Sequence, residues 1–236
     1  MSELFAEVVH PSSRAFWNEE DESEIEDNVS FTVDWTESSP EKIKTLIIAE
    51  TSFIKDFVDK CVLQDHKSIC SIKYSGSKES SKIYQLSNDS FLCLVDPQVN
   101  LTAAGDFIES ISPILSKSEN IIAITCNHVS QLKCGENTPE FSFMRSLSTR
   151  AAPEGQKKLF PLLSQPNIVA GVAAGALSYA ETTSLPGTLA ILYLEGFELD
   201  SESVEPLQAL FTHLSVPLKP FHATSHLFLD KGNLYM

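Results

Sequence analysis

Positive charge is scarce in this sequence of 236 residues. Its 17 lysines and arginines stand against 32 aspartates and glutamates, so the formal net charge at pH 7 is −15. Binding to nucleic acid or to an anionic lipid surface requires a cationic patch. The sequence also has no run of about 18 consecutive apolar residues, the length that crosses a bilayer as a helix. We therefore expect no nucleic acid and no membrane among its main partners.

The motifs of common enzymes and metal sites are missing as well. The sequence contains no GxSxG nucleophile elbow, no Walker loop, no GxGxxG dinucleotide motif and no HExxH zinc motif. None of its five cysteines belongs to a CxxC pair, the usual spacing of zinc-binding and redox cysteines. We therefore predict that it is not an enzyme and that it has no catalytic residue, no cofactor and no metal ion.

One catalytic alternative stays open at the end of a predicted buried strand. Cys126 and His128 stand two residues apart there, at the edge where open α/β sheets place their sites. A cysteine nucleophile beside a histidine base would need an orienting acid, and none lies close in the sequence. The competing interpretation is a loop histidine with local hydrogen bonds.

The cysteines and the first residues bear on the compartment. An odd number of cysteines, three of them inside apolar runs, is typical of reduced core residues. The start of the sequence lacks the basic and long apolar stretches of a secretory leader. We expect a cytoplasmic protein, with the nucleus or an association with the endoplasmic reticulum as alternatives.

Acidic residues are concentrated near the beginning of the sequence. Residues 1–41 hold twelve acids and a single base, Arg14. The stretch 19–27 has too few apolar side chains to offset the entropy of ordering it. We predict a flexible acidic N-terminal arm over 1–28, an α/β domain over 29–230 and a C-terminal tail over 231–236. The alternative function for the arm is to dock a basic partner.

Hydrophobic periodicity predicts an alternation of strands and helices between these two ends. Alternating or continuously apolar runs predict strands, and apolar residues at helical spacing predict helices. The predicted strands are 28–35, 45–49, 68–74, 82–86, 90–95, 120–126 and 188–194, and the predicted helices are 52–61, 102–116, 168–184 after an Asn167 cap, and 203–214. Residues 130–160 are predicted to form a long loop with one short strand at most. The fold class is α/β: a single domain with a mixed central sheet flanked by helices on both faces.

The predicted helix 168–184 carries small residues one turn apart. Gly171, Gly175 and Ser178 let another backbone approach closely, and Tyr179 adds an aromatic contact. The simpler interpretation is close packing of this helix on its own sheet. The more specific one is that these four residues, with the strand 188–194, form an interface with a partner protein.

The last three residues, Leu234, Tyr235 and Met236, form a hydrophobic–tyrosine–any motif after a flexible Gly232–Asn233 lead. Such a tail can insert into a receptor pocket, where Leu234 fills an apolar notch, Tyr235 stacks and a terminal carboxylate pairs with a lysine. A frayed end is the alternative. We predict that these three residues are a binding site.

Several segments resemble, in the same order, the family of proteasome assembly chaperone one. The matching segments are Phe5–Val9, Thr125–Val129, Leu163–Val169, Ala176–Tyr179, Ala190–Leu194 and Asn233–Tyr235. The resemblance is specific over 120–195 and at the tail, and vague over 40–118 and 200–228. This chain is shorter than the vertebrate members, so some loops must differ.

The resemblance implies a function and partners. It implies a chaperone that forms a heterodimer with a related second chaperone, binds proteasome α subunits, promotes α-ring formation and prevents off-pathway ring dimers. It also implies that Leu234, Tyr235 and Met236 enter a pocket between neighbouring α subunits. The alternatives are a cytosolic adaptor without a proteasome role and, less favoured, an α/β enzyme that uses His128.

Overall fold

The architecture follows from the apolar runs that the sequence places between turns. A computed structural model of the chain describes residues 30–36, 38–64, 66–75, 79–87, 89–133 and 141–221. Eight described strands form one sheet in the order β1-β3-β4-β5-β2-β6-β8-β7. The predicted acidic arm and the predicted tail lie outside the described residues.

Four parallel strands make up the centre of the sheet. They are β5 (Ser90–Leu94), β2 (Thr45–Ala49), β6 (Ile121–His128) and β8 (Gly187–Leu194). Strands covered on both faces read as continuous apolar runs, and β8 is buried along its whole length. The sequence predicted all four, with small differences at their ends.

Antiparallel strands extend this centre on both sides. One side adds β4 (Ser80–Gln85), β3 (Ser68–Tyr74) and β1 (Phe31–Trp35), and the other adds β7 (Ser142–Ser148). The sheet is therefore mixed, as predicted. The prediction for 130–160 was incomplete, because this region holds the seven-residue β7 and the short helix α4 (Glu154–Lys157). Both sides of β7 mix polar and apolar residues, and the neighbouring Phe143 and Met144 are both buried, so its sequence shows no clear alternation.

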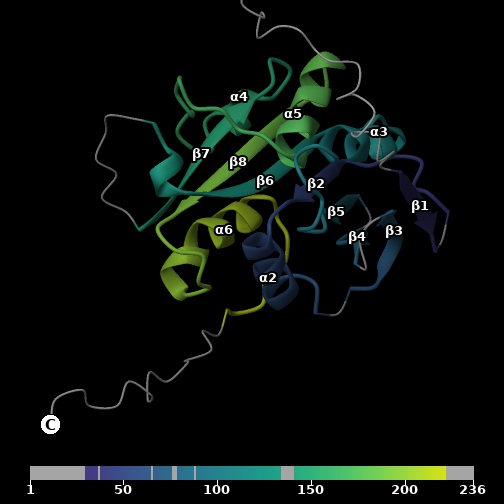
Figure 1. Cartoon of the computed structure of the whole chain (residues 1–236), viewed down its shortest axis with the longest axis horizontal. Coiled ribbons are helices and arrows are strands. Elements are labelled where there is room, and N and C mark those ends of the chain that lie inside the picture. Colours follow the sequence, from purple (N-terminus) through teal and green to yellow (C-terminus); the bar gives the residue numbers. More distant parts are fainter. Residues whose placement is uncertain are drawn as a thin grey trace, which may run out of the picture.

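Helices cover both faces of the sheet, which confirms the predicted architecture (Figure 1). One face packs against α3 (Ala104–Leu115) and α5 (Val172–Thr182), and the other against α2 (Ser52–Cys61) and α6 (Ser201–His213). A 3-10 turn, η1 (Val129–Gln131), follows β6. Each face has its own apolar core, with Phe107 central to one and Phe57 to the other.

Three helices begin at other residues than the sequence predicts, and α3 begins two residues late, at Ala104. Asn167 does not cap α5; its side chain instead bonds the backbone of Lys133 and Ser164, and the helix starts after Gly171. Helix α6 starts at Ser201 because the Asp200 carboxylate accepts the Ser203 N–H at 2.7 Å. The Ser203 hydroxyl in turn accepts the Asp200 N–H, which completes a capping box.

Candidate functional site

The carboxyl ends of β2 and β6 bring a half-buried carboxylate to the first turn of α5. Glu50 follows the last residue of β2, and its carboxylate accepts the backbone N–H groups of Val172 at 2.9 Å and Ala173 at 3.0 Å. These are two of the N–H groups that a helix cannot satisfy internally. The negative charge also lies at the positive end of the helix dipole. Glu50 thus anchors α5 to the sheet edge.

Gly171 makes this contact possible. Its φ is +99°, a conformation that favours glycine. A Cβ atom at this position would lie 2.5 Å from Oε1 of Glu50, well inside contact distance. Gly171 belongs to the predicted partner interface, for which packing within the chain was the alternative, and here it has a role within the chain.

Opposing effects act on the pKa of Glu50. Burial of the carboxylate raises it above its ordinary 4.5, and this effect outweighs the lowering by hydrogen bonds from Ala173, Val172 and the Thr125 side chain. No sequence pattern pointed to Glu50, because its backbone partners in α5 lie more than 120 residues away in the chain. Only its position directly after a buried strand could have pointed to it.

Cys126 and His128, the alternative catalytic pair, have other partners. The thiol of Cys126 lies 3.0 Å from the hydroxyl of Thr51, and burial raises the pKa of this thiol to about 11. The His128 ring has Nδ1 2.7 Å from the Ser130 hydroxyl and Nε2 2.9 Å from the Glu195 carbonyl oxygen. The Ser130 contact is local, as the alternative interpretation expected, but Glu195 is 67 residues away and His128 ends β6 instead of lying in a loop. Burial keeps Cys126 a neutral thiol, against the lowering effect of the Thr51 hydroxyl.

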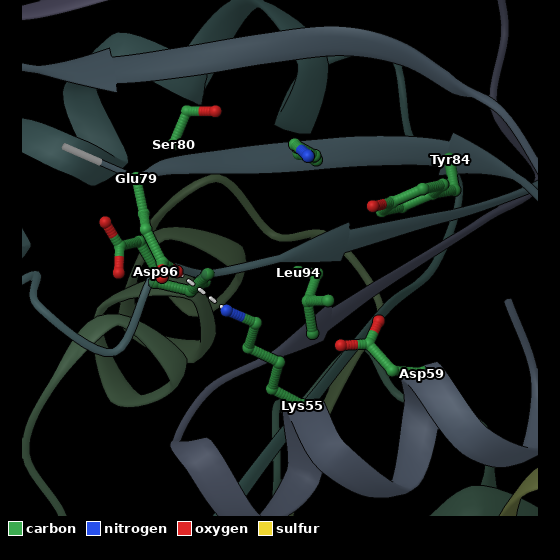
Figure 2. A pocket seen from close by; sticks show the side chains of 9 residues that line it. Lys55, Asp59, Glu79, Ser80, Tyr84, Leu94 and Asp96 are labelled. Atoms are coloured by element: carbon green, nitrogen blue, oxygen red, sulfur yellow. Dashed lines mark hydrogen bonds and ion pairs between the residues drawn. The ribbon is translucent and has the colours of Figure 1, made fainter.

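A separate pocket of about 460 Å³ lies between α2 and β4 (Figure 2). Lys55 and Asp59 enter it from the helix, Tyr84 from β4, and Leu94 and Asp96 from the end of β5. These residues come from three elements and form no sequence motif, so the pocket could not be predicted from the sequence.

Both signs of charge meet in this pocket. Lys55 donates to the Glu79 carboxylate at 2.8 Å, and this bond raises the pKa of Lys55. Burial raises the pKa of Asp59, against the lowering effect of Lys55. Burial also raises the pKa of Tyr84, with a further increase from Asp59. The arrangement suits the binding of a polar group.

The other residues of the predicted partner interface lie along α5. A Cβ atom on Gly175 would lie 2.9 Å from Cγ1 of Ile108, so this glycine lets α5 pack closely on α3. The Tyr179 hydroxyl donates to the Ser112 carbonyl at 3.4 Å, whereas Ser178 is exposed. The strand 188–194 is buried. Close packing within the chain explains the small residues, and the partner interface stays a prediction.

Leu234, Tyr235 and Met236 lie outside the described residues, so the tail also stays a prediction.

Among the residues that the structure describes, no group of three or more histidines, cysteines, aspartates or glutamates could hold a metal ion. Within the same part of the chain, no helix combines the length and apolar composition that a bilayer crossing requires.

Comparison with known protein families gives a match over most of this body. A sequence model described as proteasome assembly chaperone 4 matches residues 57–231. The chain is 30% identical over 138 residues to proteasome assembly chaperone 1 of Mus musculus. This alignment covers 56% of this chain and 47% of the mouse protein. It is 32% identical over 102 residues to the Homo sapiens protein, covering 42% and 35% of the two chains. The matches thus span less than half of these relatives' own length.

Solved structures with the same fold come from Pyrococcus furiosus. PbaB, an archaeal proteasome activator, has a TM-score of 0.61 and 13% identity, with 80% of this chain and 91% of that chain covered. PbaA, an archaeal homolog of proteasome-assembly chaperone, has a TM-score of 0.57 and 14% identity, with 80% and 88% covered. At such low identity these two structures bear on the fold alone.

Proposed function

This chain belongs to the family described as proteasome assembly chaperone 4, and on that basis we propose that it assists assembly of the proteasome by binding other polypeptides rather than by catalysis. The observation that carries the proposal is the family match over residues 57–231. The contacts of Cys126 and His128 fit it, because neither residue is arranged as an activated nucleophile or base.

The finer part of the proposal concerns partners. We propose that the chain forms a heterodimer with a related second chaperone in the cytoplasm or nucleus. The pair binds α subunits, promotes formation of the α-ring and prevents off-pathway ring dimers. We propose that the second chaperone contacts α5 and the residue before it. The contact region consists of the solvent-exposed atoms of Gly171, Gly175, Ser178 and Tyr179.

The tail is the second proposed attachment point. Leu234, Tyr235 and Met236 would enter a pocket between neighbouring α subunits, with the tyrosine as the main anchor. Attachment through both the body and the tail gains avidity, because the first contact raises the effective concentration of the second. Neither contact then needs to be tight alone, which suits a chaperone that leaves after assembly.

Co-expression of the full chain with a second assembly chaperone and α subunits tests the proposal. We expect co-purification of α subunits and a faster appearance of α-rings on native gels. If the soluble, folded chain neither captures α subunits nor changes ring formation, the proposed function is wrong.

Replacement of the tyrosine tests the tail. Tyr235→Ala should weaken α-ring binding about thirtyfold, equivalent to about 2 kcal/mol, measured by biolayer interferometry on isolated rings. Asn233→Ala, two residues earlier, is the matched control and should bind like the unchanged chain. Equal affinities for Tyr235→Ala and Asn233→Ala would remove the tail from the mechanism.

A further inference from the structure

We propose that a groove between β7 and α6 docks a basic protein segment with an apolar anchor, an interaction that does not depend on the proteasome role proposed above. The groove has a volume of about 280 Å³. It is formed by the residue before β7, the end of β8, the loop after β8 and the first turn of α6. In Figure 1 this loop connects the yellow-green α6 to the sheet.

The floor and wall of the groove expose aromatic surface. Among the described residues, five large apolar side chains are exposed, and the two aromatic ones, Phe141 at 65% and Phe197 at 55%, both line this groove. Leu101 at 65%, Leu162 at 69% and Ile168 at 87% do not line it. Exposed aromatic side chains gathered in one groove are typical of an interaction site rather than of scattered surface residues.

The charge of the groove selects the partner. Glu195, Glu198, Asp200 and Glu202 line it, and none of its lining residues is a lysine or arginine. Carboxylates around an aromatic floor complement a lysine or arginine, which pairs with the acids and stacks over the phenyl rings. An acidic segment, including residues 1–28 of this chain, carries the wrong sign. The expected occupant is therefore a basic segment of another protein that also supplies one apolar side chain.

Hydrogen bonds within the chain hold the walls of the groove. Nε2 of His128 lies 2.9 Å from the Glu195 carbonyl oxygen, and its ring packs against Phe197 with the centroids 6.2 Å apart. The Ser142 hydroxyl donates to the Glu202 carbonyl at 2.7 Å. A groove whose walls are already positioned loses little conformational entropy when a partner binds.

Site-specific photo-crosslinking on the full chain tests this proposal. The cross-linker p-benzoylphenylalanine replaces Phe197, or Ile168 as the control, and the chain is irradiated in a eukaryotic cell extract. We expect position 197 to cross-link to identified segments in which lysine or arginine neighbours an aromatic or aliphatic residue. No adduct above the Ile168 control, or adducts on acidic or uncharged segments, would overturn the groove as a docking site.

Charge reversal supplies the second readout. Glu198→Lys in the Phe197 cross-linking chain should lower the yield of the basic adduct about tenfold, and added salt should lower it in the unchanged chain. Glu109→Lys on α3, also exposed, is the matched control and should leave the yield unchanged. An equal yield in Glu198→Lys and Glu109→Lys would overturn the charge argument. A basic adduct from a protein other than a proteasome component would still support the groove, because this interaction is independent of the proposed proteasome role.

Discussion

At the scale of single residues, Glu50 explains several otherwise unrelated features. Its carboxylate binds two N–H groups of α5 and lies against Gly171. The next residue, Thr51, has a φ of +85°, an unusual value for a threonine. Strained backbone persists only where surrounding contacts enforce it. The junction of β2, α2 and α5 is thus held by side-chain contacts rather than by local backbone preference.

Gly171→Ala should destabilise the chain by about 1–3 kcal/mol, because alanine disfavours a positive φ and its Cβ would collide with Glu50. Gly105→Ala is the matched control: its Cβ would meet nothing within 4 Å, and alanine in α3 should add up to about 1 kcal/mol of stability. Urea denaturation followed by circular dichroism measures both. Equal effects of the two substitutions would contradict the close contact at Gly171.

The raised pKa of Glu50 predicts a pH dependence of stability. A carboxyl group whose pKa is higher in the folded than in the unfolded chain binds its proton more tightly when folded. Its contribution to stability is therefore largest below pH 4.5, the ordinary pKa, and falls as the pH rises through the folded-state value. The stability of the unchanged chain relative to Glu50→Gln should fall over the same range.

Denaturation midpoints between pH 4 and pH 8, measured for the unchanged chain and for Glu50→Gln, check this prediction. Glu109→Gln, at an exposed position on α3, controls for the loss of one negative charge. If the advantage of Glu50 over glutamine grew with rising pH, hydrogen bonding and the helix dipole would outweigh burial, and the assigned direction would be wrong.

The buried cysteines predict low chemical reactivity. Burial raises the pKa of Cys70 and Cys126 to about 11 and that of Cys93 to about 12, so thiolate is scarce at pH 8. We expect these three residues to resist iodoacetamide in the folded chain and to react within minutes after denaturation, as followed by mass spectrometry. Rapid alkylation of Cys126 without unfolding would contradict its assignment as a neutral, buried thiol.

At the scale of elements, α6 shows how a neighbouring strand compensates for a proline. Pro206 lies inside this helix and has no N–H to give to the carbonyl of Glu202, four residues earlier. The hydroxyl of Ser142, which begins β7, donates to that carbonyl at 2.7 Å. The bond joins the edge strand to the helix on the face of the sheet that also carries α2.

Ser142→Ala should destabilise the chain by about 1 kcal/mol, because it leaves the Glu202 carbonyl without its donor. In a Pro206→Ala background the helix can supply its own N–H, so the same substitution should cost less. A double-mutant cycle by urea denaturation measures this coupling. Ser178→Ala, whose hydroxyl bonds only within α5 at Ala174, is the control. Additive effects of the Ser142 and Pro206 substitutions would contradict the compensation.

At the scale of the whole molecule, charge and fold are separate. Most of the negative charge belongs to residues 1–41, whereas the described body has an apolar core on each face of its sheet. The described body begins at residue 30. We therefore expect folding to depend on apolar burial in the body, to which residues 31–35 contribute β1.

Deletion of residues 1–28 should change the melting temperature of the body by no more than a few degrees and should have a small effect on α-subunit capture. Deletion of residues 234–236 should leave the melting temperature unchanged and weaken capture strongly. Differential scanning fluorimetry and co-purification measure the two properties. If the first deletion abolished partner binding and the second did not, the acidic segment would be the docking element and the adaptor alternative would be favoured.

The sequence by itself determined the layers of this protein. Continuous apolar runs such as 45–49 and 188–194 predict buried parallel strands. The helical spacing of Phe53, Ile54 and Phe57 predicts the helix that follows the first of these strands. Both predictions succeed because burial imposes a local periodicity on the sequence. It also carried the resemblance to a chaperone family. The tertiary structure alone decided where α5 begins, which groups surround Glu50 and which acids gather around Phe141 and Phe197. Those contacts join residues far apart in the chain, and no local pattern encodes which distant segments will meet.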